Sequence, residues 1–383
     1  VHMWLDKDGR KQRHRFVRGL MRSVAALSYL QVQRAVDGEP DEATGPLVET
    51  ILRPLYGAYA ALNAAREARQ PLSIDLPERK VEIGADGYIK AVHRRERFDA
   101  HKLIEEFMVL ANVAAAETLE AVKQPCMYRV HDEPSMEKLE SLREFLSTIG
   151  FKLARGNIVK PALFNRILKD VVGKPNEGVV NTVVLRSQMQ AVYSGDNRGH
   201  FGLALRRYAH FTSPIRRYSD LLVHRALITG CKLGGDGLSE ADIAKFEDTA
   251  EHISRAERRA MAAERDALDR FTAAFMSNRV GASFMGRISG VTRFGLFVQL
   301  DETGADGLIP VSGIGDDYYD HDDSRHALVG RHNGRTFRLG DRVEVKLVEA
   351  DVITGGLKLE LLRDLDEQTS TPSKGRFQRG RQG

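Results

Sequence analysis

The chain has 383 residues, which is too long for one compact core of ordinary size, so its length predicts at least two domains. Hydrophobic residues make up 42% and charged residues 29% of the chain, a balance that excludes a mainly disordered protein. The net charge of +4 equals the charge of residues 370–383 alone, where four basic residues occur without an acid.

Hydrophobic periodicity predicts a helix-rich region that extends to about Arg279. In chain order we expect a strand with a hairpin turn at 1–9, helix within 41–69, a strand–turn–strand at 81–95, a helix at 99–123, two helices within 135–170, a helix at 214–229 after Pro214, and one long helix at 240–279. The last helix places Glu264 on an apolar stripe between Ala260 and Leu268. A carboxylate at such a position is paired, reaches solvent or has a function.

The pattern changes after Gly281 to the two-residue alternation of strands. Five short segments show this alternation: 283–291, 294–300, 308–311, 342–350 and 357–361. Five short strands within about 80 residues are typical of a small barrel of the OB type. We therefore expect an α+β protein with domains at 1–279 and 280–363, followed by a flexible basic tail at 364–383.

Two clusters of basic residues lie within the predicted domains. Residues 7–22 carry seven basic side chains and one acid, and residues 198–225 carry six arginines and one acid. Arginine binds phosphate through two parallel hydrogen bonds, and the aromatic residues between these arginines offer faces to bases. The alternative is that these arginines pair with acids from other parts of the chain, but the few nearby acids favour phosphate binding.

No segment is typical of a membrane protein or of a secreted protein. The longest nearly apolar stretch, residues 107–116, is far shorter than the roughly 20 residues of a membrane-spanning helix. The two cysteines, Cys126 and Cys231, are too few for a disulfide framework, which favours a reducing compartment. We therefore expect a cytoplasmic protein without a membrane partner.

The first strands of the predicted barrel contain two neighbouring aromatic residues. Strand alternation cannot bury both Phe294 and Phe297 on one face, so one of the two rings is expected on the surface. A surface ring on an OB barrel can stack on a base, which contributes roughly 1–3 kcal/mol for each base. Residues 286–298 resemble the S1-type RNA-binding barrel, and the resemblance continues through 307–312 and 339–343. It implies that Phe294 and Phe297 bind RNA.

Residues 200–221 contain the most informative string, which begins with HFGLAL and continues with YAHFTSPIRRYSDL. This string resembles the signature of the RNase II / RNase R (RNB) family of hydrolytic 3′→5′ exoribonucleases. Further resemblance to this family lies at 23–29, 100–108 and 129–134, and the insert at 316–319 and the basic tail resemble its RNase R branch. Because the resemblance covers essentially the whole chain, it implies that 1–279 is the C-terminal portion of an RNB catalytic domain.

The resemblance also implies roles for particular residues. The essential arginine of the family corresponds to Arg216, which is implied to contact the scissile phosphate and to stabilise its charge during catalysis. Ser213 and Arg217 on the same turn are implied to bind the RNA backbone. Tyr29 and Glu105 are implied to bind the 3′ nucleotide, where a carboxylate that accepts from a 2′-hydroxyl distinguishes RNA from DNA.

The metal site of the family is an aspartate cluster that is expected upstream of Val1, and residues 1–200 contain no replacement for it. We therefore expect Mg²⁺ as cofactor, with its ligands outside this chain. The family carboxylate that corresponds to Glu264 is implied to lie near the substrate. The predicted function is processive, Mg²⁺-dependent hydrolysis of RNA from its 3′ end to nucleoside 5′-monophosphates. The expected partners are single-stranded and structured RNA, and the sequence identifies no protein partner.

Three alternatives compete with this function. A chain that lacks the aspartate cluster can bind RNA without cutting it. The second alternative is a hydrolase with a catalytic triad of Ser213, His210 and Asp220, although no nucleophile-elbow glycines surround Ser213. The third is phosphorolysis, because polynucleotide phosphorylase also carries an S1 barrel, although its catalytic strings and the GxxG loop of its KH domain are not found.

Overall fold

The computed structural model describes residues 1–74, 79–85, 89–94, 96–154, 159–174, 176–322 and 325–366. The chain divides into two compact units: the first comprises residues 1–76 and 96–262, and the second comprises residues 77–95 and 263–383. Most of the predicted basic tail, residues 367–383, lies outside the described residues. No helix in the described part of the chain is both long and apolar enough to cross a membrane.

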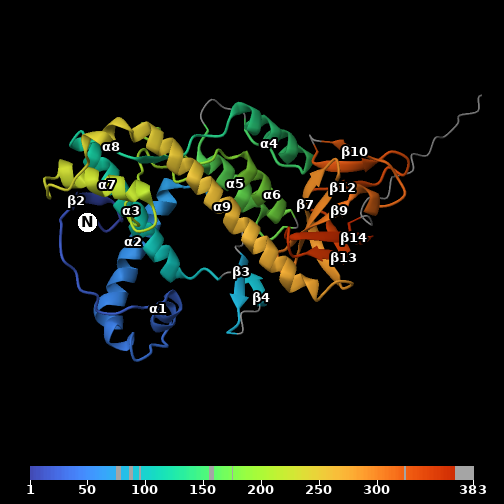
Figure 1. Ribbon diagram of the computed structural model, residues 1–383, viewed down its shortest axis with the longest axis horizontal. Helices are drawn as coiled ribbons and strands as arrows, with labels where there is room; N and C mark the ends of the chain where they lie inside the picture. The colour runs from blue at the N-terminus through green and yellow to red at the C-terminus, as the bar shows by residue number, and fades with distance from the viewer. Residues whose placement is uncertain are drawn as a thin grey trace, which may run out of the picture. The chain divides into compact units, whose positions relative to one another are not determined.

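The first unit is rich in helices, as its periodicity predicts (Figure 1). Its helices are α1 (Tyr29–Val36), α2 (Arg53–Arg69), α3 (Asp99–Ala121), α4 (Met136–Thr148), α5 (Pro161–Val171), α6 (Glu177–Ser187), α7 (Tyr218–Gly230), α8 (Glu240–Ala244) and the first part of α9 (Phe246–Ser277). A 3₁₀ turn at Gly45–Leu47 and a π turn at Val48–Leu52 lead into α2. Two antiparallel pairs complete the unit, β1 (His2–Leu5) with β2 (Lys11–Arg15) and β5 (Tyr128–Val130) with β6 (Val192–Ser194).

The core of the first unit forms where α3 and α7 pack with β5 and β6. On α3, Ala116 and Leu119 are fully buried, and Leu222 and Ala226 of α7 are nearly so. In each pair the residues are three or four positions apart, which places them on one helix face. The helices α4, α5 and α6 pack together nearby, and α6 contacts both of the others (Figure 1).

The second unit contains the closed five-stranded barrel that the alternation predicts (Figure 1). Its strands are β7 (Ser283–Thr292), β8 (Gly295–Leu300), β9 (Asp306–Pro310), β13 (Arg342–Asp351) and β14 (Gly356–Asp364). They close in the order β13-β14-β9-β8-β7, and only the β14–β9 pair is parallel. This order is not the chain order, so the barrel is a Greek-key barrel like the OB fold.

The interior of the barrel is apolar. Leu296, Val298 and Leu300 alternate inward along β8 and are fully buried. Ala273 and Met276, near the end of α9, belong to the same core. Gly295, at the β7–β8 turn, has a φ of 153°, and a Cβ atom there would lie 2.2 Å from the carbonyl oxygen of Ile309. Only glycine fits this position.

A small sheet between β9 and β13 was not predicted. It consists of β10 (Tyr319–Asp322), β11 (Ala327–Gly330) and β12 (Thr336–Arg338), which pair in this order as antiparallel strands. These strands have only three or four residues each, which is too short to show a clear alternation. The predicted strand–turn–strand is confirmed as β3 (Arg79–Ile83) and β4 (Ile89–Arg94).

Several helix predictions were wrong in detail. Helix α7 begins at Tyr218 and not after Pro214, because Arg217 adopts an extended conformation with φ −127° and ψ 120°. The helix predicted over 240–279 is divided at Lys245 into α8 and α9. Helix α6 was not predicted as a separate element.

The predicted apolar stripe on α9 was confirmed only in part, because Leu268 is half-buried and Phe275 packs against the barrel core while the other positions are exposed. Ala260 and Glu264 are both exposed, and Phe271 is 44% exposed. The buried positions of the helix lie elsewhere, at Ala250 and, further along, at Ala273. Glu264 therefore needs no buried partner, because its carboxylate is in contact with solvent.

Candidate functional site

The signature segment, residues 200–221, begins in a tight turn. The backbone groups of His200 and Leu205 bond to each other in both directions, at 2.8 Å and 3.2 Å. The turn is held from outside, since its Gly202 carbonyl accepts from the Leu72 N–H at 2.7 Å. A Cβ atom on Gly202 would lie 2.9 Å from Nδ1 of His131, so glycine allows this close approach. The turn thus joins the end of α2 to the strand β5.

Asn112 of α3 fixes the middle of the signature segment. Its amide nitrogen donates to the Tyr208 hydroxyl at 2.9 Å, and its amide oxygen accepts from the Phe211 N–H at 2.8 Å. The side chain is 2% exposed, so both hydrogen bonds are shielded from water. Phe211 is held further by its ring, which stacks on His224 at 4.4 Å between centroids.

Asp220, in the first turn of α7, fixes the end of the segment. Its carboxylate accepts from the Ser213 N–H at 2.7 Å, and from Nε and a terminal nitrogen of Arg217 at 2.8 Å each. Burial alone would raise the pKa of this carboxyl, but the hydrogen bonds from Arg217 and Ser213 hold it below its ordinary value. Asp220 is therefore a buried anion, and it shapes the 213–217 turn.

Arg216 and Arg217 differ in what they contact. Arg217 is held against Asp220, whereas Arg216 is exposed and has no ion pair within the described residues. Beside them, the Thr212 hydroxyl is buried and has no hydrogen-bond partner in the described part of the chain. The turn therefore presents a free guanidinium from a backbone that a buried anion fixes.

His210 and Ser213 do not form a catalytic pair. Nδ1 of His210 lies 2.9 Å from the Tyr193 hydroxyl, and Asp220 bonds to Arg217 and to the Ser213 backbone. Burial, followed by the charge of Arg217, lowers the pKa of His210 to about 3, so the ring is neutral at pH 7. This arrangement does not fit a Ser/His/Asp hydrolase, in which the histidine bonds to the nucleophile and to the acid.

Tyr29 and Glu105 both lie near His101 in the first turns of α3. Tyr29 is 43% exposed, and its ring stacks on His101 at 4.0 Å between centroids with an interplanar angle of 23°. Glu105 lies one helical turn after His101, is partly exposed and forms an ion pair with Arg97. Tyr29 also lines an apolar groove of about 320 Å³, together with residues of α1, α2 and α3.

On the barrel, the two predicted phenylalanines lie side by side. Phe294 is 54% exposed in the β7–β8 turn, and Phe297 of β8 is half-buried. Their rings are 6.2 Å apart at an interplanar angle of 85°. An exposed ring supported edge-to-face by its neighbour is a suitable surface for stacking a base.

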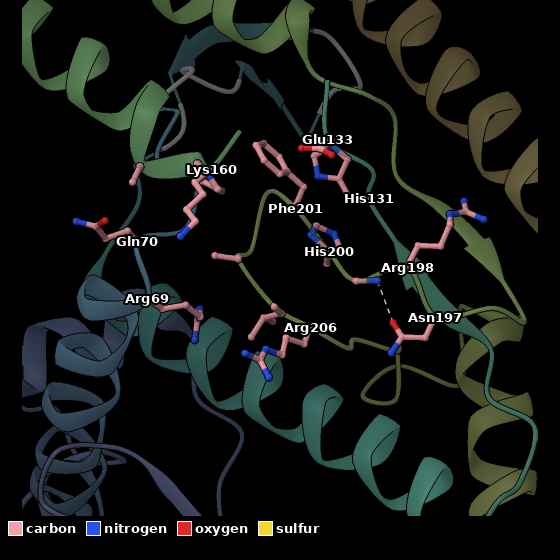
Figure 2. Close-up of a pocket in the computed structure, with 15 residues that line it drawn as sticks. Arg69, Gln70, His131, Glu133, Lys160, Asn197, Arg198, His200, Phe201 and Arg206 are labelled. Atoms are coloured by element: carbon pink, nitrogen blue, oxygen red, sulfur yellow. Dashed lines mark hydrogen bonds between the residues drawn. The ribbon is translucent and has the colours of Figure 1, made fainter. Parts of the chain in front are cut away.

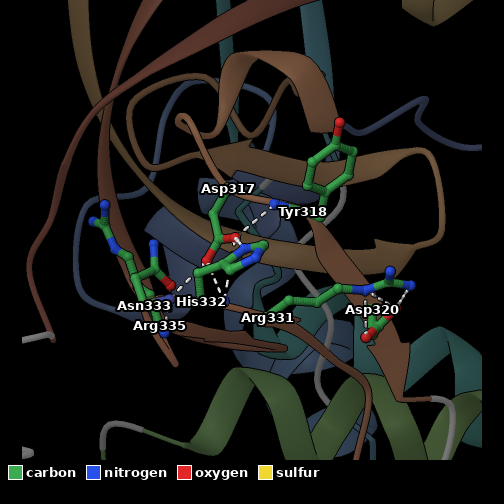
Figure 3. Close-up of polar contacts among 7 residues, drawn as sticks. All are labelled: Asp317, Tyr318, Asp320, Arg331, His332, Asn333 and Arg335. Atoms are coloured by element: carbon green, nitrogen blue, oxygen red, sulfur yellow. Dashed lines mark hydrogen bonds and ion pairs between the residues drawn. The ribbon is translucent and has the colours of Figure 1, made fainter.

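Asp317, in the insert before β10, has a structural contact network (Figure 3). Its carboxylate accepts backbone N–H groups from Tyr318 at 2.7 Å, His332 at 3.0 Å and Asn333 at 2.9 Å. The hydrogen bond from the Asn333 N–H is the largest of the effects that hold the pKa of Asp317 well below its ordinary value. The carboxylate joins the insert to the loop after β11.

The arginine cluster at 198–225 is more paired than expected. Four of its six arginines form ion pairs with acids: Arg198 with Asp132, Arg207 with Glu120, Arg217 with Asp220 and Arg225 with Asp242. The acids are distant in the sequence for all but Arg217, so counting nearby acids was misleading. Within the described residues, only Arg206 and Arg216 of this cluster have no ion pair.

The predicted site residues thus form separate groups. Tyr29 and Glu105 lie around His101, Ser213 and Arg216 lie on the turn before α7, and Glu264 is exposed on α9. In the described part of the chain, no hydrogen bond or ion pair joins the first group to the second. Nor do any three His, Cys, Asp or Glu side chains among the described residues come together as metal ligands.

Comparison with known proteins matches each of the two parts of the chain to a known domain family. The RNB domain matches residues 1–232, and the S1 RNA binding domain matches residues 277–361. Ribonuclease R of Escherichia coli is 41% identical over 355 residues, which cover 90% of this chain and 44% of that protein. Ribonuclease R of Aquifex aeolicus is 38% identical over 96% of this chain and 52% of that protein. The chain therefore spans about half the length of the curated relatives it matches.

Solved structures give the same result. The apo form of Mycoplasma genitalium RNase R has a TM-score of 0.88 at 28% identity, and the match covers 94% of this chain and 57% of that chain. The complex of the same protein with ribose-methylated single-stranded RNA has a TM-score of 0.87, with the same identity and coverage. From its two domain matches and these relatives, the chain belongs to the RNase II / RNase R (RNB) family and is similar to bacterial ribonuclease R.

Proposed function

We propose that this chain belongs to an RNase R-like exoribonuclease that hydrolyses RNA processively from its 3′ end to nucleoside 5′-monophosphates with the help of Mg²⁺. The observation that carries this proposal is the free guanidinium of Arg216 on a turn fixed by Asp220. We propose domains at 1–279 and 280–363 and a cytoplasmic location, which is consistent with free thiols at Cys126 and Cys231.

Arg216 is suited to stabilise charge on a phosphoryl group. A guanidinium is always charged and offers two parallel hydrogen bonds to phosphate oxygens. Because Asp220 holds Ser213 and Arg217, the backbone on both sides of Arg216 is fixed before RNA binds. Such preorganisation lets the arginine act at the transition state without rearrangement. In this proposal Arg217 orients the turn, and Ser213 faces the RNA backbone.

The other predicted residues bind the strand. Tyr29 stacks on the 3′-terminal base, and Glu105 accepts from a ribose 2′-hydroxyl after release from Arg97. Phe294 and Phe297 stack on a base at the barrel, and Glu264 lies close to the strand. Single-stranded and structured RNA are the proposed partners. A solved relative, M. genitalium RNase R, forms complexes with ribose-methylated single-stranded RNA and with double-stranded RNA.

The described residues do not fit a Mg²⁺ site, which needs several oxygen ligands close together. No step of the reaction is therefore assigned to a metal held by this chain. This observation favours a second candidate function, in which the chain binds RNA but does not cut it. The two functions differ in one measurable product, the released nucleotide.

The test uses the 383-residue chain with uniformly labelled single-stranded RNA and Mg²⁺, so that each released nucleotide carries label. Release of nucleoside 5′-monophosphates supports the nuclease, and retention of intact RNA at the same occupancy supports the binding function. In a longer chain that supplies the aspartate cluster of the family, Arg216→Ala is expected to lower turnover on the order of 10²- to 10³-fold and to weaken RNA binding less, as for removal of one charge-stabilising donor. Arg166→Ala, an exposed arginine on α5, is the matched control. Equal loss of binding and turnover in Arg216→Ala would make Arg216 a binding residue only.

A further inference from the structure

A cavity of about 690 Å³ lies in the first unit and is separate from the residues assigned above (Figure 2). It opens where the HFGLAL turn of the signature meets the end of α2 and the start of α5. Its volume lies within the roughly 300–1,000 Å³ of small-ligand pockets. None of the residues assigned to the RNA strand or to the scissile phosphate lines it.

The lining of this cavity is cationic. Arg206 and Lys160 contribute side chains that are exposed and have no ion pair within the described residues. Arg69 also lines it, with Nε donating to the Leu203 carbonyl at 3.0 Å and a terminal nitrogen paired with Glu106 at 3.7 Å. Arg198 adds a fourth cation, which pairs with Asp132 at 3.1 Å. Glu133 is the one acid of the lining, so the cavity favours an anion.

Two rings of the same turn form part of the wall, His200 and Phe201 (Figure 2). Nδ1 of His200 lies 3.2 Å from the Leu203 N–H and accepts from it. Burial lowers the pKa of His200 to about 3, so the ring is neutral and carries its proton on Nε2. In the described part of the chain that N–H has no partner, so it is available to donate to a ligand.

We propose that this cavity binds a nucleoside monophosphate unit, with its phosphate between Arg206 and Lys160 and its base against His200 and Phe201. Cations for the phosphate, rings for the base and a neutral N–H donor are the groups that such a ligand needs. The unit has two sources, a free nucleotide or a nucleotide within an RNA strand. Binding of a free nucleotide is independent of the proposed cleavage, so the two proposals fail separately.

Two lysines of the α5 region provide a matched pair of variants. Lys160 precedes the helix and lines the cavity, whereas Lys169 is exposed near its other end and does not. Isothermal titration of the 383-residue chain with adenosine 5′-monophosphate, adenosine and inorganic phosphate measures the site directly. We expect Arg206→Glu and Lys160→Glu to weaken adenosine 5′-monophosphate binding at least about tenfold, and Lys169→Glu to leave it unchanged. Adenosine is expected to bind at least about tenfold more weakly than its monophosphate.

Measurements of single-stranded RNA binding distinguish a free nucleotide from a nucleotide within an RNA strand as the ligand. If the free nucleotide does not bind, but Arg206→Glu weakens single-stranded RNA binding about tenfold while Lys169→Glu does not, the cavity holds a nucleotide of the strand. If neither nucleotide nor RNA binding responds to Arg206→Glu and Lys160→Glu, the proposal is overturned. Equal effects of Lys169→Glu and Lys160→Glu would also overturn it, because they would reflect general charge. Circular dichroism of each variant identifies loss of folding.

Discussion

The two units of this protein differ in how far their buried charges shape a candidate site. The barrel of the second unit has an apolar core, in which Leu296, Val298 and Leu300 are fully buried, and the buried Asp364 at the end of its last strand pairs with Arg335 at 3.8 Å. The first unit also buries ionised and polar side chains, including Asp220 at 0% and Glu106 at 6% exposure. Glu106 is paired with Arg66 at 3.0 Å, and Asp220 with Arg217 at 2.8 Å. The first unit therefore depends on buried charge pairs, and one of them, Asp220 with Arg217, also shapes the candidate site.

In the barrel, the residues that stabilise the fold differ from the candidate binding residues. In the first unit, the same residue contributes to both. In the barrel, the candidate binding ring of Phe294 is exposed, while the core that supports it is apolar. In the first unit, Asp220 holds both the start of α7 and the turn that carries Arg216. Changes of charge or pH are thus expected to affect the first unit most.

The largest expected effect is that of Asp220→Ala. The substitution leaves Arg217 and the Ser213 N–H without their buried partner, and breaking a buried charge pair lowers the free energy of unfolding by about 3–5 kcal/mol. Trp4, the one tryptophan of the chain, lies in the first unit, so its fluorescence in a urea titration reports on that unit. Hydrogen exchange of barrel peptides is the control and is expected to be unchanged. Equal loss of protection in both units would contradict the comparison.

Much of the fold was predictable from local patterns, whereas the positioning of the site was not. Strand alternation predicted all five barrel strands, because one face of each strand meets a continuous apolar core. The start of α7 was misplaced because a side-chain contact of Asp220 determines it. Arg69, Lys160 and Arg206 meet at one cavity from distant parts of the sequence, and no local signal joins them.

The next largest effect is the loss of stability of the first unit on acidification. Burial depresses the pKa of His200 and of His210 to about 3, whereas an unfolded histidine titrates near 6.5. Their contribution to stability is therefore complete above pH 6.5 and is lost as the pH falls from 6.5 towards 3. At pH 5 we expect the first unit to lose about 2–4 kcal/mol relative to pH 7. Urea titrations followed by Trp4 fluorescence measure this free energy of unfolding. A value that does not change between pH 7 and pH 5 would contradict the prediction.

The barrel is expected to respond to pH in the opposite direction. Burial raises the pKa of Asp341 to about 6, although its carboxylate accepts from the Arg338 N–H at 2.6 Å. The protonated form is therefore favoured in the folded barrel, and the associated stability is lost as the pH rises from about 4 through 6. We expect Asp341→Asn, which keeps the acceptor, to stabilise the barrel by about 1–2 kcal/mol at pH 7. At pH 4, hydrogen exchange of the barrel should show equal stability for the variant and the parent. A gain in stability at both pH 4 and pH 7 would mean that the substitution acts through packing and not through the charge.

The smallest effect expected is on RNA binding, and it tests whether the barrel separates binding from stability. Phe294→Ala removes an exposed ring, so we expect about 1 kcal/mol of lost stacking, or about a fivefold increase in the Kd for single-stranded RNA. Because Phe294 is outside the apolar core, the barrel should keep its hydrogen-exchange protection. Leu296→Ala is the opposite control, since it opens a cavity in the core and destabilises the barrel by about 3 kcal/mol. If Phe294→Ala destabilised the barrel as Leu296→Ala does, the ring would be a structural residue, and the separation of binding from stability in this unit would be wrong.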